Sequence, residues 1–164
     1  MYDRPQNLYD LCDQVCESIA ARPQNYIQQY WADKNVAASL KDACGNSKAT
    51  SLIANHEMCG TAYCRAGWMM AILYDGPVSS ETVEIGKKAS SLLENAGVPL
   101  SDIESLFRGN WAGPLDTWGT PSYVQRGIDG MQKFMNAYSY KLKAAKLVYG
   151  KEPGDVQVKR TLVS

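Results

Sequence analysis

The chain of 164 residues is 45 % hydrophobic and 21 % charged, which fits a single globular domain with a sizeable core. Lysine plus arginine equals aspartate plus glutamate, at 17 each, so the whole chain has no positive surplus for binding nucleic acid or an anionic membrane. No apolar run reaches the roughly 20 residues that span a bilayer, and the N-terminus lacks the apolar core of a signal peptide. Because the cysteines number five, an odd count, we expect free thiols in a cytoplasmic protein.

The first predicted element is a helix capped by Asn7. Its apolar face would consist of Leu8, Leu11, Cys12, Val15 and Ile19. The helix should end before Pro23, because the residue before a proline is pushed out of the α region. Pro23 also suits the first turn of a second helix, with an aromatic face of Tyr26, Ile27, Tyr30 and Trp31. A weak helical pattern continues over residues 33–40, and residues 44–51 have the composition of a polar loop.

A central helix is predicted within residues 55–76, the stretch with the most unusual side chains. Thr61 would cap it, so that it begins at Ala62 and continues to about residue 73. Cys64 and Trp68 then lie one turn apart, and we expect both to be buried. Gly67 costs helix stability, which indicates that another helix crosses closely there.

The next helix should follow a stop signal at residues 75–77, with Ser79 or Ser80 as its cap. Its apolar face would consist of Ile85, Ala89, Leu92, Leu93 and Ala96. Gly97 followed by Pro99 is typical of a helix C-terminus. Residues 101–104, Ser-Asp-Ile-Glu, match a capping box and predict a short helix that carries Ile103, Leu106 and Phe107.

A loop over residues 108–120 carries Trp111 and Trp118, which are either pinned onto the core or part of a binding surface. Pro121 then marks the start of the longest regular pattern in the chain. Its apolar stripe consists of Val124, Ile128, Met131, Met135, Tyr138, Leu142, Ala145 and Tyr149. The stripe predicts one long C-terminal helix of roughly 28 residues, which serves the core or, in part, a homodimer seam along residues 124–149.

These patterns together predict an all-α fold, a compact single domain of five or six helices over residues 1–150. Residues 151–164 form a polar C-terminal tail. Disorder stays open for it, as does a short strand or docking on a partner through Val156, Val158, Leu162 and Val163.

The segment before the central helix has several interpretations. Cys59 would lie at the helix N-terminus, where the dipole favours a thiolate, and His56 is the one histidine available as its base. The same N-terminus could instead bind an anion or nucleotide at residues 60–63, with Gly60, Thr61, Arg65, Trp111 and Trp118 as candidate ligand-binding residues. An irregular metal set is His56, Cys59, Cys64 and Cys44. We favour packed thiols without cofactor or metal, with a Cys59–Cys64 disulfide as a lesser alternative.

Arg65 falls in the first turn of the predicted helix. We expect it to form a surface or intramolecular ion pair, for example with Glu57, rather than to bind an anionic ligand.

Residues 59–68, C-G-T-A-Y-C-R-A-G-W, resemble the C-G-T-x-x-C-x-A-G-W signature of short bacteriophage and bacterial proteins to which no activity is assigned. A weaker resemblance extends over about two thirds of the chain, through residues 22–31, the L-F-x-x-x-W element at residues 106–111, and Ile128 with Phe134. The chain departs from the signature at Arg65, where an apolar residue is expected, and in a longer insertion over residues 32–53. The resemblance implies a phage or bacterial cytoplasmic protein, often an accessory factor that acts on host proteins.

No set of catalytic residues in the sequence is complete. We therefore predict a non-catalytic protein-interaction or regulatory accessory module with an unidentified protein partner, rather than an enzyme. The alternatives are a cysteine-dependent enzyme or thiol-redox protein at Cys59, and a small-ligand or nucleotide-binding module at residues 60–63. Nucleic acid is not an expected partner, because the total charge is balanced.

Overall fold

The computed structural model describes residues 4–21, 32–33, 62–63, 65–75, 85–108, 121–152 and 154–160. Its helices there are α1 (Leu8–Ala21), α4 (Arg65–Tyr74), α5 (Ile85–Asn95), α6 (Leu100–Arg108), α7 (Pro121–Ala137) and α8 (Ser139–Ala144). Two antiparallel strand pairs accompany them, β1 (Ala32–Asp33) with β2 (Ala62–Tyr63), and β3 (Ala145–Tyr149) with β4 (Val156–Arg160). The fold is mostly helical, as predicted, but the strand pairs show that it is not all-α.

Helix α1 matches its prediction at both ends. The Asn7 side chain caps it by accepting a hydrogen bond from the backbone N–H of Asp10 at 2.8 Å. The helix ends at Ala21, two residues before Pro23. The predicted apolar face is fully buried at Leu8, Leu11, Cys12, Val15 and Ile19.

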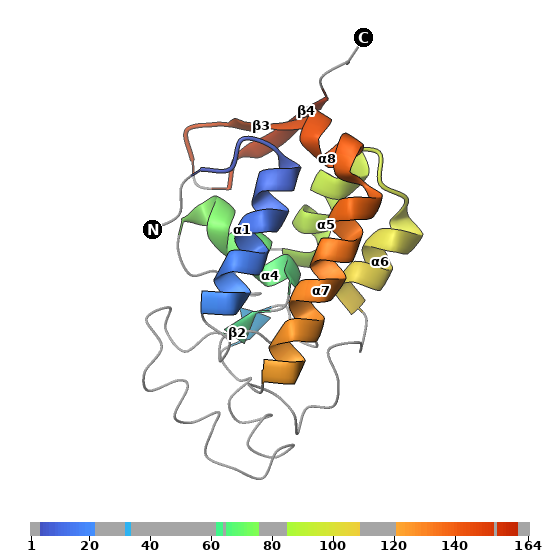
Figure 1. The fold of residues 1–164 in the computed structure, drawn as a ribbon. Coiled ribbons are helices and arrows are strands. Elements are labelled where there is room, and N and C mark those ends of the chain that lie inside the picture. The colour runs from blue at the N-terminus through green and yellow to red at the C-terminus, as the bar shows by residue number, and fades with distance from the viewer. Residues whose placement is uncertain are drawn as a thin grey trace.

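Helix α4 forms the centre of the core. Nine of its ten residues are buried, and it packs against α1, α5 and α6. Figure 1 shows α1 and α7 side by side in front of it. A helix buried on all sides belongs to the middle of a domain. The predicted burial of Trp68 is confirmed, and Gly67 is also buried, whereas the close helix crossing at Gly67 stays a prediction. Cys64 lies outside the described residues.

The predicted start of this helix is wrong. Residues 62–63 form β2, in which Ala62 pairs with Asp33 and Tyr63 with Ala32, and α4 begins three residues later than expected, at Arg65. The weak helical pattern predicted from residue 33 is also wrong at that residue, because Asp33 belongs to β1. Local spacing could not show this pairing, because the two strands are about 30 residues apart in the chain.

The turn between α5 and α6 has the predicted glycine stop. Gly97 has a φ of +92°, and its N–H donates to Glu94 O while the N–H of Val98 donates to Leu93 O. These two bonds define a Schellman motif. The predicted capping box is wrong, because α6 begins at Leu100 and Ser101 is already inside it. The apolar face of α6 is confirmed, since its predicted members are buried: Ile103, Leu106 and Phe107.

The single long C-terminal helix is also wrong. Helix α7 ends at Ala137, Tyr138 adopts φ −118° and ψ 22°, and the short α8 leads directly into β3. Leu142 and Ala145, which continue the predicted apolar stripe, are buried in the protein's own core, and so is Leu147 of β3. A homodimer seam along one protruding helix over residues 124–149 therefore has no structural basis.

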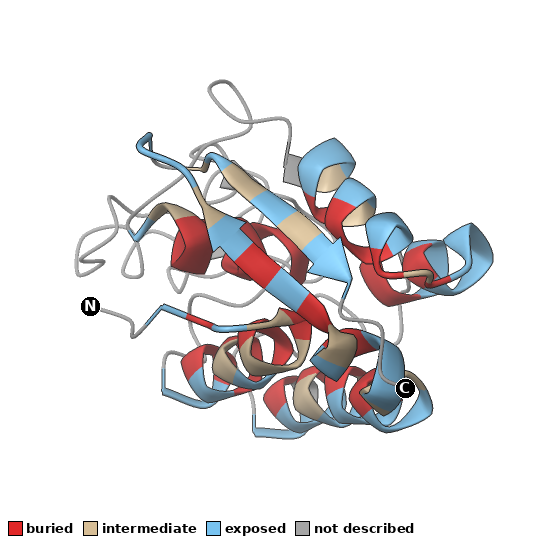
Figure 2. Ribbon diagram, turned by 90° about the horizontal axis from the view of Figure 1, so that it is seen from above, coloured by how far each residue is buried: buried red, intermediate tan, exposed pale blue. Residues whose placement is uncertain are grey.

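A β-hairpin takes the place of that helix and of the first part of the predicted tail. Ala145 pairs with Arg160 and Tyr149 with Val156, so the short-strand alternative for the tail is confirmed at residues 156–160. Buried and exposed residues alternate along β3, as Figure 2 shows in the view onto this end. The N-terminal segment runs beside β3, where Leu147 N–H donates to Gln6 O at 3.0 Å.

No helix in the described part of the chain is both long and apolar enough to cross a membrane.

Candidate functional site

Arg65 is the one predicted site residue whose side chain the structure describes. It is the first residue of α4 and is fully buried. Its Nη1 donates to the backbone carbonyl of Leu106 at 2.9 Å, while Nε and Nη2 donate to the carbonyl of Gly127 at 3.1 and 2.9 Å. The expectation of a surface position is therefore wrong. An ion pair with Glu57 is untested, because Glu57 lies outside the described residues.

The two acceptors explain why a guanidinium is placed there. Leu106 O is one of the last four carbonyls of α6, which have no partner within their own helix. A cation at this end also interacts favourably with the helix dipole. Gly127 O belongs to α7. A helical side chain lies over the turn before it, so the absence of a side chain at Gly130 leaves the Gly127 carbonyl accessible to Arg65. The forked donors of Arg65 thus join α4 to both α6 and α7.

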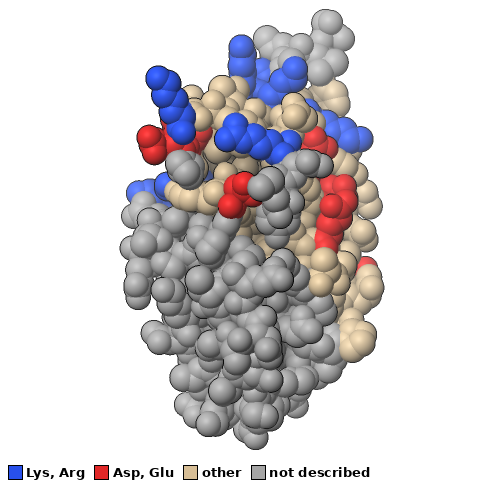
Figure 3. Space-filling model, turned by 90° about the vertical axis from the view of Figure 1, so that its left-hand side faces the viewer, with Lys and Arg blue, Asp and Glu red and all other residues tan. Residues whose placement is uncertain are grey.

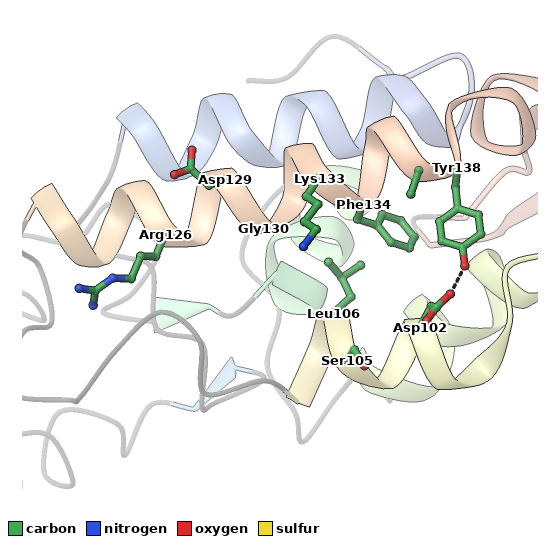
Figure 4. Close-up of a pocket in the computed structure, with 10 residues that line it drawn as sticks. Asp102, Ser105, Leu106, Arg126, Asp129, Gly130, Lys133, Phe134 and Tyr138 are labelled. Atoms are coloured by element: carbon green, nitrogen blue, oxygen red, sulfur yellow. Dashed lines mark hydrogen bonds between the residues drawn. The ribbon is translucent and has the colours of Figure 1, made fainter.

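A groove of about 570 Å³ lies between α6 and α7. It adjoins the contact described above, because Leu106 accepts the hydrogen bond from Arg65 and also lines the groove. Leu106 lines it from α6, and Phe134 and Ala137 line it from α7. The ring of Tyr138 lies 5.2 Å from that of Phe134. Its hydroxyl donates to the Asp102 carboxylate and closes one end of the groove (Figure 4).

The charged side chains of the groove differ in whether they form hydrogen bonds within the chain. Asp102 accepts the bond from Tyr138, and Asp129 Oδ1 accepts a bond from Gln125 Nε2 at 2.7 Å. Lys133 has no hydrogen bond or ion pair with another described residue, and Figure 4 shows its ammonium group directed across the groove toward α6. The groove therefore offers an apolar floor and an available cation, which is the chemistry of a site for an acidic, partly apolar segment.

A second cavity, of about 450 Å³, lies between α5 and β4. Lys88 on its rim donates to the Tyr74 hydroxyl at 2.9 Å and lies over the Tyr74 ring. Because this cation is already bonded within the chain, the cavity has a weaker case for an anionic ligand than the α6–α7 groove.

The described thiols, Cys12 and Cys16, are free, buried and one turn apart on α1. Burial raises the pKa of both groups, and that of Cys16 rises to about 12, with Asp13 adding to the rise and Arg65 opposing it. A thiol with a raised pKa is protonated at neutral pH and is a poor nucleophile. Both cysteines therefore act as small apolar core residues, as the predicted apolar face indicated for Cys12.

These thiols should make the protein less stable in alkali. In the unfolded chain a thiol ionises near pH 9, whereas in the folded chain it stays protonated, so the stabilisation is complete below pH 9 and declines above it. We expect each thiol to account for a loss of about 1 kcal/mol in the free energy of unfolding by about pH 10. Urea unfolding at pH 8 and pH 10 measures this, with Cys12→Ala/Cys16→Ala as the control. An equal decline in this variant would contradict the assignment.

The other predicted site residues lie outside the described part of the chain: His56, Cys59, Gly60, Thr61, Cys64, Cys44, Trp111 and Trp118. The later start of α4 bears on two of the interpretations. Because the unpaired N–H groups of a first turn begin at Arg65 and not at Ala62, the dipole argument for a Cys59 thiolate or an anion at residues 60–63 loses its basis. Among the residues that the structure describes, no cluster of three or more acids, cysteines or histidines could hold a metal.

No family model, curated protein or solved structure matches the chain. The resemblance of residues 59–68 to the phage and bacterial signature therefore stays a prediction.

The sequence analysis missed the groove residues Lys133, Asp102 and Asp129. One signal was present, because Arg126, Asp129 and Lys133 recur at steps of three and four beside the apolar stripe of α7. That spacing places them along one edge of the helix but does not show that α6 lies opposite.

Proposed function

We propose that the protein is a non-catalytic protein-interaction module whose α6–α7 groove binds an acidic, partly apolar segment of a partner protein. The observation that carries the proposal is Lys133, which points across an apolar groove while the neighbouring carboxylates are bonded within the chain. The cytoplasmic setting and the phage or bacterial origin belong to the same proposal. The buried free thiols of Cys12 and Cys16 support the first, and the 59–68 motif supports the second.

The shape of the groove favours a peptide segment over a small cofactor. It is formed by two helices, so a segment lying along it can place apolar side chains on Leu106 and Phe134. A carboxylate of the same segment can then reach Lys133, and a charge at the rim of an interface contributes mainly to orientation and association rate. The exposed Lys133 is suited to this role, whereas the bonded Asp102 helps to fix the wall that the segment contacts.

A peptide library displayed on phage tests the proposal while the partner protein is still unidentified. The library is selected on the folded chain and depleted on Lys133→Glu, so that the surviving peptides depend on the groove cation. We expect the survivors to share one or more acidic residues flanked by apolar ones. Survivors without acidic residues, or no enrichment over the depleted pool, would contradict the proposal.

A charge reversal in the groove should weaken binding of a selected peptide. We expect Lys133→Glu to raise Kd about tenfold or more, because a like-charge contact replaces an attraction. Lys151→Glu, at an exposed position in the β3–β4 turn, makes the same change in charge away from the groove and should leave Kd unchanged. Fluorescence anisotropy of the labelled peptide measures both, and equal weakening by the two variants would show that only net charge matters.

A further inference from the structure

The β3–β4 hairpin and the end of α8 before it carry a local positive surplus that the balanced total conceals. Residues 141–160 include six basic and two acidic side chains, a surplus of four positive charges, while the rest of the chain has the opposite surplus. Figure 3 shows lysine and arginine side chains gathered at this end of the molecule. A polyanion that approaches this end of the molecule would be attracted by the local positive potential, although the net charge of the whole chain is zero.

Two lysines face each other on the outer side of the hairpin. Lys146 of β3 is directly paired with Lys159 of β4, and both are exposed. In an antiparallel ladder directly opposite side chains project from the same face with Cβ atoms about 5 Å apart, so a like-charge pair is destabilising. The neighbouring pair on this face is Val148 with Gln157, both exposed, and it adds no negative charge.

No described carboxylate compensates this pair. Neither Lys146 nor Lys159 forms an ion pair or a side-chain hydrogen bond with another residue of the described ranges. The two acids of the hairpin, Glu152 and Asp155, lie in the turn, about 10 Å along the strands from the lysines. Nearby cations differ in this respect, since Lys141 donates to Gly97 O and Lys143 lies over the Tyr9 ring.

We propose that the outer face of the β3–β4 hairpin binds the phosphate backbone of double-stranded DNA. Lys146 and Lys159 would neutralise phosphates, and Gln157 in the neighbouring pair of the same face can donate a further hydrogen bond. The four-residue face contains no aromatic ring on which an unpaired base could stack, which disfavours a single strand. Its one apolar side chain is the branched Val148, which is 48 % exposed, and no aromatic ring or leucine of this face accompanies it for insertion among lipids, which disfavours a membrane. This surface is separate from the groove of the proposed function.

Fluorescence anisotropy with a labelled DNA duplex of mixed sequence tests the proposal on the full chain. We expect binding at about 50 mM salt that weakens about tenfold or more at about 200 mM, since Lys146 and Lys159 would each neutralise a phosphate. Lys146→Glu/Lys159→Glu should lower the affinity more than tenfold and reduce the salt slope by about two. The matched variant Arg126→Glu/Lys133→Glu, with the same change in charge in the groove, should bind the duplex like the unchanged chain.

A stability measurement separates lost binding from lost folding. Lys146→Glu alone converts the repulsive pair into a cross-strand ion pair, so its melting temperature should equal or exceed that of the unchanged chain while its duplex affinity falls. The proposal is overturned if the unchanged chain does not bind the duplex at the lower salt, or if the double hairpin variant binds as tightly. Tighter binding to a single strand, or binding only to vesicles of phosphatidylserine and phosphatidylcholine, would also overturn it.

Discussion

Arg65→Ala is expected to lower the free energy of unfolding by about 3–5 kcal/mol, because it removes charge-assisted hydrogen bonds to buried carbonyls and a large buried side chain together. The substitution removes three hydrogen bonds from a fully buried guanidinium. It leaves Leu106 O at the end of α6 without that donor, and it opens a cavity where α4, α6 and α7 meet. Urea unfolding followed by far-ultraviolet circular dichroism measures the loss.

Two further substitutions divide this loss into its causes. Arg65→Met keeps most of the side-chain volume and should still cost about 1–3 kcal/mol, because the buried carbonyl has lost its donor. Arg65→Lys keeps the charge but not the fork that reaches two carbonyls, so it should also be less stable than arginine. If Arg65→Met unfolds at the same urea concentration as the unchanged chain, the hydrogen bonds of Arg65 make no net contribution to the free energy of unfolding. The proposal that they stabilise the packing of α4 against α6 and α7 would then be wrong.

Trp68→Ala is expected to cost a similar amount, about 3–5 kcal/mol, for a different reason. Trp68 is fully buried in α4, the helix that other helices surround, so truncation removes a large apolar surface and leaves a cavity. Differential scanning calorimetry should show a clear fall in melting temperature. Tyr140→Ala is the matched control, because that aromatic side chain is 66 % exposed and its loss should change stability by less than about 0.5 kcal/mol. A Trp68→Ala melting temperature equal to that of Tyr140→Ala would contradict the central position of α4.

Sequence periodicity predicted the elements whose contacts are local. The Asn7 cap and the apolar face of α1, and the Gly97 stop of α5, each depend on residues within about two turns of the chain. Periodicity gave the wrong structure at β3, because Ala145 and Tyr149 also fit the apolar stripe that predicted a helix continuing from α7. There the pairing with β4 and the packing of Leu147 decided the structure, and neither is visible from spacing along one segment.

The candidate site was less accessible to sequence reasoning. A charged residue such as Arg65 is usually exposed or ion-paired, and its acceptors lie 41 and 62 residues away in the chain. Lys133 of the groove and the paired lysines of the hairpin look like ordinary surface residues until the opposite helix or strand is known. The zero net charge concealed the hairpin surplus, because acidic residues elsewhere in the chain balance it.

The α6–α7 groove as a docking site for an acidic segment is tested most directly by a charge swap between Lys133 and a selected peptide. Isothermal titration would compare four combinations: the unchanged chain and Lys133→Glu, each with the peptide and with its acidic residue replaced by lysine. We predict that each single reversal weakens binding about tenfold or more and that the doubly reversed pair recovers most of the affinity. If the doubly reversed pair binds no better than either single reversal, while circular dichroism shows Lys133→Glu folded, Lys133 does not contact the segment and the proposed site is wrong.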